Sequence, residues 1–599
     1  MINSRAGDLD NSSAETELRS QDLRVDRILI TDVGHPPSRP FPGLAVPRIP
    51  IPVAALVAFG ATWCWLDVPR TGRTTETILA EYVFAAGVSL LIIALLGKFN
   101  AILSSLRLNR WVLDVPVAVV LFVLIWMLGM RHFGGYDHSE AVQAAWLQLR
   151  NLIPFRDFPL TLPPLFFLGA RYAFLFFGVR WSSFVLWIAI FCVASFFLLA
   201  RQFRALGFSP IVATSLALTA ELGTTVVCSY WWYNPATSMA VAMVFTSTLV
   251  CLSHPEKARN WFLLGTAFTL LLLSKPNGWP IGGCLVPLFF AKGARRRRPL
   301  IVIAFSLLFS ALICWVHGLD PLGVLRSYSG VAATRGNPFR SIFHGRPHEC
   351  NPVETFLLVA AAATLVGLFL RALAANRGNF RSDWREYSIC CFSVFTALAM
   401  FNMNAELKTS DLMPLVLALA MLIFQPWSSC QSKSTGRTAI VVVITFFVTL
   451  STYWAMTRTR VRTIGEGMFF EAVPTQTIQS GFFKGMHSGP RLIRVLKQIE
   501  SALHKYPANK VFFGPRMEFS YAVFHREPPK GLPIWWDPGT SFALEDFFSI
   551  SREFDNNNFD LLIFLKGDYT RFGLLYKITS YEKVNEFSEL DVYVRRKKR

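Results

Sequence analysis

An acidic residue opens a polar stretch that directly follows an apolar segment of the chain. The stretch begins Tyr136-Asp137-His138-Ser139-Glu140 and continues with apolar residues at helical spacing to residue 149. A carboxylate in this position can act as a general base that takes a proton from an acceptor hydroxyl. We therefore take Asp137 as the first candidate base and Glu140 as a substitute for it. The alternative is structural: Asp137 or Ser139 caps the following helix, and Glu140 favours its first turn.

A second acid, Asp157, follows in the segment Pro154-Phe155-Arg156-Asp157-Phe158. It is the third candidate catalytic residue. Together with Asp137 it could also hold a divalent metal ion through carboxylate oxygens, and no other cofactor is predicted. The alternative is a turn in which Asp157 pairs with the neighbouring Arg156.

Two lysines beside apolar segments are candidates for binding a phosphate group. Lys275 begins a Lys-Pro-Asn-Gly turn between two short apolar runs, and Lys408 precedes an apolar run at 412–425. An ammonium group at membrane depth needs a partner or water, and a lipid phosphate would be a suitable partner. For Lys275 the alternative is snorkelling to the membrane surface. For Lys408 the alternative is a pair with Asp411 at i, i+3.

A third group of candidate binding residues lies in the segment 319–352. His344 and Arg346 stand there together with Arg335, Arg340 and His348. Such a cluster could bind a pyrophosphate or an anionic acceptor. The alternative is a basic loop that is solvated or contacts lipid headgroups.

The chain that carries these residues is too apolar for an ordinary soluble enzyme. Of its 599 residues, 53% are hydrophobic and 16% are charged, whereas an ordinary soluble domain is about 25% charged. The net charge is +20. In a soluble protein this excess would suggest nucleic acid, but here it indicates basic loops between membrane spans. We predict membrane lipids as partners and no nucleic acid.

Thirteen apolar runs approach the length that crosses a ~30 Å hydrocarbon core. They lie at residues 49–66, 79–97, 112–130, 181–200, 208–228, 234–252, 261–274, 279–291, 299–318, 353–370, 387–403, 412–425 and 439–456. The seventh and eighth runs are short, and an α-helix of about 14 residues rises only ~21 Å. This predicts that the turn at Lys275 lies recessed in the membrane, lined by protein.

The charge of the loops predicts the direction of the spans. With the amino terminus in the cytoplasm, the cytoplasmic loops hold 18 Lys/Arg in 66 residues and the outer loops 13 in 113. This asymmetry follows the positive-inside rule. It places the loops 131–180 and 319–352 outside, and after an odd number of spans it also places residues 457–599 outside.

Three parts of the chain are predicted. Residues 1–48 are polar and form a disordered cytoplasmic tail, and residues 49–456 form the multi-span domain. Residues 457–599 contain no cysteine and form a small extracytoplasmic α/β domain. In this last part the segment 490–504 has helical spacing, and 510–513, 560–565 and 591–594 are typical of short strands.

The loop at 131–180 also resembles a known family. Its order of features is Tyr-Asp-x-x-Glu, a helix, Pro-Phe-Arg-Asp-Phe, Pro-Pro-Leu and a Phe-Gly end. This order is similar to the first large outer loop of GT-C glycosyltransferases. Within that superfamily it looks most like bacterial relatives of protein mannosyltransferases and aminoarabinose transferases, which use polyprenyl-phosphate sugars. The resemblance covers about residues 112–454 and implies that Asp137 is the catalytic acid of the family.

The sequence departs from the family in two places. The loop follows the third span instead of the first. In addition, Thr161-Leu162 stands where some relatives have Glu-Lys, so one expected lipid-phosphate contact is missing.

The predicted fold is therefore an all-α polytopic membrane protein with about thirteen GT-C-like transmembrane helices and a small C-terminal α/β domain. The predicted function is transfer of a sugar from a polyprenyl-phosphate donor to a lipid, glycan or protein acceptor. The protein is predicted to cross the bacterial inner (plasma) membrane several times and to transfer the sugar on the outer face of that membrane.

One alternative function is a transporter or flippase of lipid-linked saccharides. Such a protein should show repeats in matching halves, and no repeat is visible in the sequence. The other alternative is a non-catalytic assembly partner, which would tolerate loss of Asp137.

Overall fold

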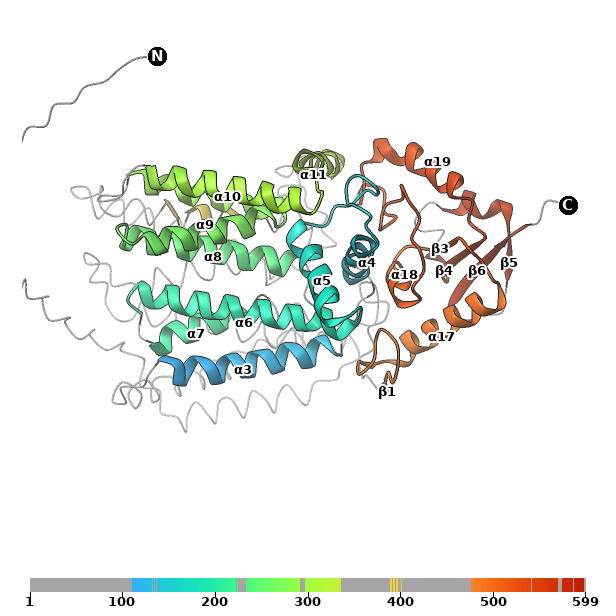
Figure 1. Cartoon of the computed structure of the whole chain (residues 1–599), viewed down its shortest axis with the longest axis horizontal. Coiled ribbons are helices and arrows are strands. Elements are labelled where there is room, and N and C mark those ends of the chain that lie inside the picture. The colour runs from blue at the N-terminus through green and yellow to red at the C-terminus, as the bar shows by residue number, and fades with distance from the viewer. Residues whose placement is uncertain are drawn as a thin grey trace, which may run out of the picture. The chain divides into compact units, whose positions relative to one another are not determined.

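The computed structural model describes residues 110–335 and 476–596, each with short gaps, and several residues between 388 and 400. These residues are mostly helical, with two small sheets near the C-terminal end (Figure 1). The predicted tail at 1–48 lies outside the described residues. So do the predicted spans at 49–66, 79–97, 353–370, 412–425 and 439–456, and most of 387–403. Thirteen spans therefore stay a prediction.

The first described part is built from helices. They are α3 (Arg110–Gly129), α4 (Asp137–Leu149), α5 (Pro164–Phe177), α6 (Trp181–Ala205), α7 (Pro210–Glu221), α8 (Tyr233–Ser253), α9 (Ala258–Leu272), the 3-10 helix η2 (Pro276–Phe290), α10 (Arg297–Val316) and α11 (Pro321–Arg335). Helices α3, α6, α8, α9 and α10 run side by side in Figure 1. The predicted helix at 141–149 is present as α4 and begins four residues earlier.

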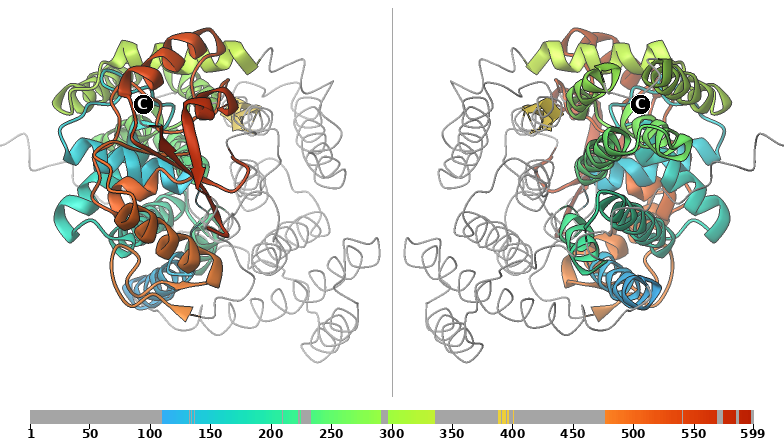
Figure 2. Two further views of the ribbon diagram at one scale, coloured as in Figure 1. Left: turned by 90° about the vertical axis from the view of Figure 1, so that its right-hand side faces the viewer. Right: turned by 90° about the vertical axis from the view of Figure 1, so that its left-hand side faces the viewer.

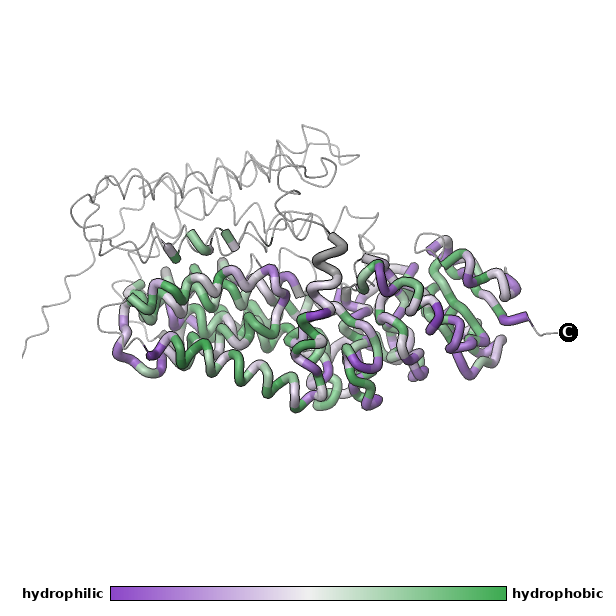
Figure 3. Tube along the Cα trace, turned by 90° about the horizontal axis from the view of Figure 1, so that it is seen from above, coloured by the Kyte–Doolittle hydropathy of each residue, from purple (hydrophilic) through white to green (hydrophobic). Residues whose placement is uncertain are grey.

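Three of the described helices are long and apolar enough to cross a membrane: Trp181–Ala205, Asn234–Ser253 and Arg297–Val316. The apolar parts of α3 and α5 are shorter. Figure 3 shows the long hydrophobic stretches along the bundle. Helix α8 is almost wholly buried by its neighbours, whereas α10 keeps large apolar side chains such as Leu308 and Trp315 more than 70% exposed. An exposed apolar face of this extent is typical of contact with lipid.

A buried ion pair joins α3, α6 and α7. The guanidinium of Arg204, in the last turn of α6, contacts the carboxylate of Asp114, and the hydroxyl of Thr214 donates to the same carboxylate at 2.7 Å. The cation at the C-terminal end of α6 also complements the helix dipole. Removing one partner would leave the other charge buried and uncompensated, which is the costly case for such pairs.

The segment predicted as the short span 279–291 differs from an α-helix. It forms the 3-10 helix η2 over 15 residues, with Pro280 and Pro287 inside it. Proline has no N–H group for the α-helical hydrogen bond and clashes with the preceding turn. Since a 3-10 helix rises ~2.0 Å per residue, η2 covers ~30 Å instead of the ~22 Å of an α-helix of the same length. The segment therefore extends farther along its axis than an α-helix of the same number of residues would.

The C-terminal part is a four-stranded mixed sheet with helices. Its elements are α17 (Pro490–Lys505), β3 (Val511–Phe513), α18 (Phe519–Val523), η4 (Leu544–Asp546), α19 (Phe547–Asn557), β4 (Leu561–Leu565), η5 (Leu575–Ser580), β5 (Tyr581–Val584) and β6 (Leu590–Arg595), preceded by the hairpin strands β1 (Gln476–Thr477) and β2 (His487–Ser488). The order is β3-β4-β6-β5, with β3 and β4 parallel and the other pairs antiparallel. The three predicted strands and the predicted helix are all present.

Both faces of this sheet are covered, because β3 and β4 are apolar throughout and place their side chains alternately on the two faces. Phe513 and Ile563 belong to one core, which also contains the apolar face of α17. Phe512, Phe564 and the α19 residue Phe554 belong to the other. Figure 2 shows the sheet between these helices.

Backbone hydrogen bonds connect the C-terminal part to the segment 130–181. The N–H of His487 donates to the carbonyl of Met130 at 2.8 Å, that of Trp181 to Phe482 at 2.9 Å, and that of Gly531 to Asp157 at 2.9 Å. The two segments are thus in direct contact and must lie on the same side of a membrane.

Candidate functional site

The site is built around the start of α4, where Asp137 is the first helical residue. Gly135 precedes it with φ 80°, a conformation that glycine adopts at no steric cost, and this lets the chain turn sharply between α3 and α4. The side chain of Asp137 lies outside the described residues. Its roles as base, cap or metal ligand therefore stay predictions.

The residues that follow Asp137 are buried. His138, Ser139 and Glu140 are all less than 5% exposed. The ring of His138 packs against Phe133 and Trp181, with ring centroids 6.2 and 5.2 Å away. Glu140 also interacts with its surroundings. The first turn of α4 is therefore held inside the protein and is not a freely solvated helix start.

Ser139 connects α4 to the C-terminal part. Its hydroxyl donates to Glu518 Oε2 at 2.9 Å and accepts the N–H of Phe519 at 2.8 Å. The other oxygen of Glu518 accepts the N–H of Arg516 at 2.8 Å. One carboxyl group thus fixes Ser139, two residues from Asp137, to the start of α18.

Burial changes the charge state of Glu518. Desolvation raises the pKa of its carboxyl group from 4.5 to about 8, although the hydrogen bonds from Arg516 and Ser139 oppose this change. At neutral pH the group is then mostly protonated and neutral. A neutral carboxyl group beside the first turn of α4 does not repel an ionised Asp137.

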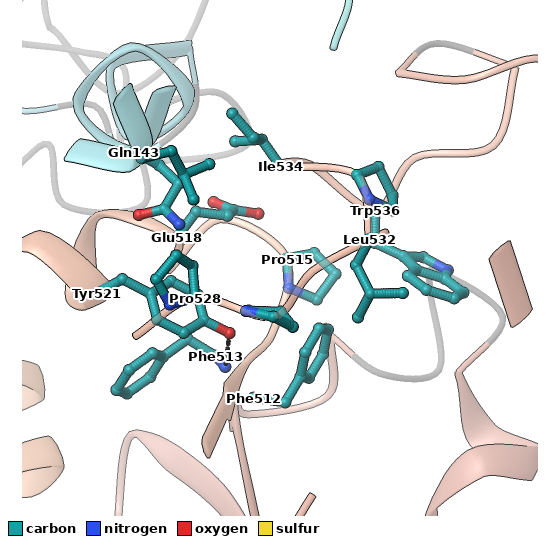
Figure 4. Close-up of a pocket in the computed structure, with 13 residues that line it drawn as sticks. Gln143, Phe512, Phe513, Pro515, Glu518, Tyr521, Pro528, Leu532, Ile534 and Trp536 are labelled. Carbon is teal, nitrogen blue, oxygen red and sulfur yellow. Dashed lines mark hydrogen bonds between the residues drawn. The ribbon is translucent and has the colours of Figure 1, made fainter. Parts of the chain in front are cut away.

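A small cavity lies beside this contact (Figure 4). It is lined by Gln143, Glu518, Tyr521 and Trp536, among others, and its volume is about 20 Å³. The Oε1 atom of Gln143 is buried there and accepts no hydrogen bond from a described residue. The volume is that of about one water molecule, so this cavity is too small for a substrate.

Asp157 lies in a turn and pairs with Arg156, which is the structural alternative to a catalytic role. Its Oδ2 atom accepts the N–H of Ile153 at 2.7 Å, and Arg156 donates Nε to Oδ1 at 3.0 Å and Nη2 to Oδ2 at 2.8 Å. The hydrogen bond from Arg156, followed by that from Ile153, holds the pKa of Asp157 below its usual range. A carboxylate stabilised in this way is a weaker base than a free one.

These contacts also bear on a metal ion at Asp157. Three of its roughly four acceptor positions are occupied, and a cation there would lie beside the Arg156 guanidinium. Within the ranges that the structure describes, no cluster of three His, Cys, Asp or Glu side chains is suited to hold a metal ion. The described residues at Asp157 therefore do not favour a metal site, and the metal role of Asp137 stays a prediction.

Lys275 lies at the junction between α9 and η2. Its Nζ donates to Asn234 Oδ1 at 3.2 Å, and its backbone N–H donates to the Thr237 hydroxyl at 3.2 Å. Two residues earlier, the carbonyl of Leu273 accepts the N–H of Leu165 at 2.9 Å. Lys275 is thus held beside the first turn of α8. Its neighbour in sequence, Leu273, contacts the Pro-Pro-Leu segment at the start of α5.

The remaining predicted binding residues, Lys408, Arg346 and His344, lie outside the described residues. Whether they converge with Lys275 and Asp137 on one cavity stays a prediction. Reasoning from sequence missed Glu518. No local pattern linked it to Ser139, which is 379 residues away.

Comparison with known proteins finds no matching family model and no curated protein. Among solved structures, the chain is similar to ArnT from Cupriavidus metallidurans bound to undecaprenyl phosphate, with a TM-score of 0.42 and 11% identity over 80% of this chain and 97% of that one. It is also similar to the oligosaccharyltransferase AglB from Archaeoglobus fulgidus in complex with an inhibitory peptide and a dolichol-phosphate, with a TM-score of 0.34 and 15% identity over 81% of this chain and 74% of that one. Both belong to the GT-C glycosyltransferases, the group that the loop at 131–180 resembles.

Proposed function

We propose that the protein is an integral membrane glycosyltransferase. It takes a hexosyl or pentosyl group from a polyprenyl-phosphate donor and transfers it to a lipid, glycan or protein acceptor on the outer face of the membrane. The observation that carries the proposal is the start of α4. An acid that matches the family's catalytic position stands there at the first residue of a helix whose next three residues are buried, and the second of these, Ser139, is bound to Glu518 of the C-terminal part.

In this proposal Asp137 takes the proton from the acceptor hydroxyl as its oxygen attacks the anomeric carbon. The new glycosidic C–O bond forms while the bond from the anomeric carbon to the donor phosphate breaks, and the electron pair leaves with the polyprenyl phosphate. The resemblance implies that this direct displacement inverts the anomeric centre.

Lys275 stabilises the departing phosphate in the same proposal. A charge-assisted hydrogen bond from an ammonium to a phosphate oxygen is about twice as strong as a neutral one. The contacts of Lys275 support this role, because Asn234 and Thr237 hold the residue at the first turn of α8, beside the contact between Leu273 and Leu165. Lys408 would add a second cation. Glu518 and Ser139 position the helix that carries Asp137.

The test is mass spectrometry of the surface glycolipids and glycoproteins of the host cell, with and without this protein. Loss of one sugar modification, restored by the wild-type chain but not by Asp137→Asn, is the expected result. A transporter would instead require the chain for export of a saccharide that is already complete. A cell without the protein that keeps every surface glycan would contradict the proposal.

A further inference from the structure

Helix α5 lies across the ends of neighbouring helices of the bundle (Figure 1). Near its start, the N–H of Leu165 donates to the carbonyl of Leu273 at the end of α9. Farther along, Arg171 contacts His317, the residue that follows α10, and the end of α5 leads directly into α6. The end of a membrane-spanning helix marks the boundary of the membrane. A helix that touches the ends of α9, α10 and α6 therefore runs along this boundary instead of crossing the membrane.

The last turn of α5 exposes large apolar side chains at this boundary. Three of them are each more than half exposed: Leu175, Phe176 and Phe177. At the adjoining end of α10, Trp315 and Val316 are also more than half exposed. Helix α5 thus continues the apolar face of α10 that is typical of contact with lipid. A helix at the boundary with such a face inserts it between the headgroups and the acyl chains.

The charge beside these apolar side chains is only positive. The segments 128–135, 164–181 and 476–488 are held together by the hydrogen bonds of His487 to Met130 and of Trp181 to Phe482. They contain no Asp or Glu and four basic residues: Arg131, Arg171, Arg180 and Lys484. The nearest acid after α10, Asp320, accepts two N–H groups in the first turn of α11 instead. Because basic residues are normally depleted outside a membrane, this cluster on the predicted outer side indicates a negatively charged partner.

Arg171 belongs to a hydrogen-bonded group that is left with donors to offer. Its Nη1 lies 2.6 Å from His317 Nδ1, and since a guanidinium can only donate, Nδ1 accepts and the ring carries its proton on Nε2. This N–H donates to the Tyr172 hydroxyl at 3.0 Å. Tyr172 is 39% exposed, and its own O–H finds no acceptor in the part of the chain that the structure describes. The guanidinium and this O–H together suit an oxygen-rich anion such as a phosphate.

We propose that α5 lies in the headgroup region of the outer leaflet and that Arg171, Tyr172 and His317 bind the phosphate of an anionic phospholipid. A lipid is favoured over a free phosphate because exposed apolar side chains flank the cations. An anionic headgroup is favoured over a zwitterionic one because the joined segments offer no carboxylate to an ammonium group. This inference goes beyond the proposed function and does not depend on it.

Native mass spectrometry of the purified full chain, titrated separately with phosphatidylglycerol, phosphatidylcholine and inorganic phosphate, measures this binding. The wild type should bind phosphatidylglycerol more tightly than the other two. Arg171→Gln should weaken this binding about tenfold, as expected for one lost charge-assisted hydrogen bond. Tyr172→Phe, which keeps the ring and removes the hydroxyl, should weaken it about threefold. Arg552→Gln, an exposed arginine on α19, is the matched control and should bind as the wild type.

Three results would overturn the phospholipid site. They are equal affinity for phosphatidylglycerol and phosphatidylcholine, binding of inorganic phosphate as tight as that of phosphatidylglycerol, and unchanged binding in both Arg171→Gln and Tyr172→Phe. Undecaprenyl phosphate separates this site from a donor site. The two lipids should bind together, whereas displacement of phosphatidylglycerol by undecaprenyl phosphate, lost in Arg171→Gln, would assign the residues to the donor instead. A protein that binds phosphatidylglycerol as expected but transfers no sugar would overturn the proposed function and leave the phospholipid site intact.

Discussion

At the scale of single residues, the first turn of α4 depends on one buried carboxyl group in a distant part of the chain. Glu518 accepts hydrogen bonds from Ser139 and Arg516 and is protonated at neutral pH because its pKa is raised to about 8. Glutamine has nearly the same shape and is neutral, so Glu518→Gln should preserve the contact. Glu518→Ala leaves the Arg516 N–H and the Ser139 hydroxyl without their acceptor and should lower the free energy of unfolding by about 1–3 kcal/mol. Chemical unfolding in detergent measures both, and equal loss in the two variants would contradict the prediction.

The raised pKa of Glu518 also predicts a pH dependence. Between about pH 4.5 and 8 the folded protein binds a proton at Glu518 that the unfolded chain has released. The free energy of unfolding must then fall as the pH rises through this window. Glu518→Gln has no such proton, so its stability relative to the wild type should increase from pH 5 to 8 and level off above 8. Parallel curves for the two proteins would show that Glu518 does not titrate in this way.

Lys275 provides a prediction about the donor. Its Nζ is held beside Asn234, and a charge-assisted hydrogen bond is worth about 1.5–3 kcal/mol. Lys275→Gln should therefore weaken binding of a polyprenyl-phosphate sugar by about 10–100-fold, and Lys275→Arg should recover part of it. Lys497→Gln, an exposed lysine on α17, serves as the control. Donor binding that is unaffected by Lys275→Gln would remove this residue from the site.

At the scale of elements, helices α5 and α6 approach each other closely at Gly169. A Cβ atom there would lie 2.2–2.4 Å from three atoms of the Trp187 ring. Gly169→Ala should therefore push α5, and the Pro-Pro-Leu segment at its start, away from α6. We expect a loss of about 1–3 kcal/mol in the free energy of unfolding, as is usual for overpacking, together with reduced sugar transfer.

A second substitution tests this mechanism. If the clash with the indole causes the loss, Gly169→Ala in a Trp187→Leu background should cost much less than in the wild type, which a double-mutant cycle measures. Additive effects of the two substitutions would contradict the proposed contact.

The sequence predicted those elements whose pattern is local. Val511–Phe513 and Leu561–Leu565 are short apolar runs that contain β-branched and aromatic residues, and α17 has an apolar stripe, so each was recognisable alone. The 3-10 geometry of η2 was missed because hydropathy measures how apolar a run is and does not register the effect of Pro280 and Pro287 on hydrogen bonding. The contact between Ser139 and Glu518 was not predictable, because neither residue is distinctive where it stands and no local pattern specifies a partner so far away.

At the scale of the whole molecule, the contact between segment 130–181 and the C-terminal part has a topological consequence. Both must face the same side of the membrane, and the loop charges predict that this is the outside. A cysteine placed at exposed positions Arg150 or Glu500 should then react with a membrane-impermeant maleimide in intact cells. A cysteine at exposed Arg259, in a predicted cytoplasmic loop, should react only after permeabilisation, and the chain without added cysteines gives the background. Labelling of positions 150 and 500 from opposite sides would contradict the structure, and labelling of both only after permeabilisation would reverse the predicted orientation.

Sugar transfer by purified protein tests the central claim, that Asp137 is the base of a polyprenyl-phosphate-dependent glycosyltransferase. Asparagine keeps the size of the side chain and caps a helix about as well as aspartate, but it cannot take up a proton. With the sugar donor and the acceptor identified by mass spectrometry, Asp137→Asn should transfer about 10²–10⁴-fold more slowly than the wild type, with unchanged unfolding and donor binding. Transfer by the Asp137→Asn protein at a near-normal rate would contradict the claim and leave Asp137 as a helix cap.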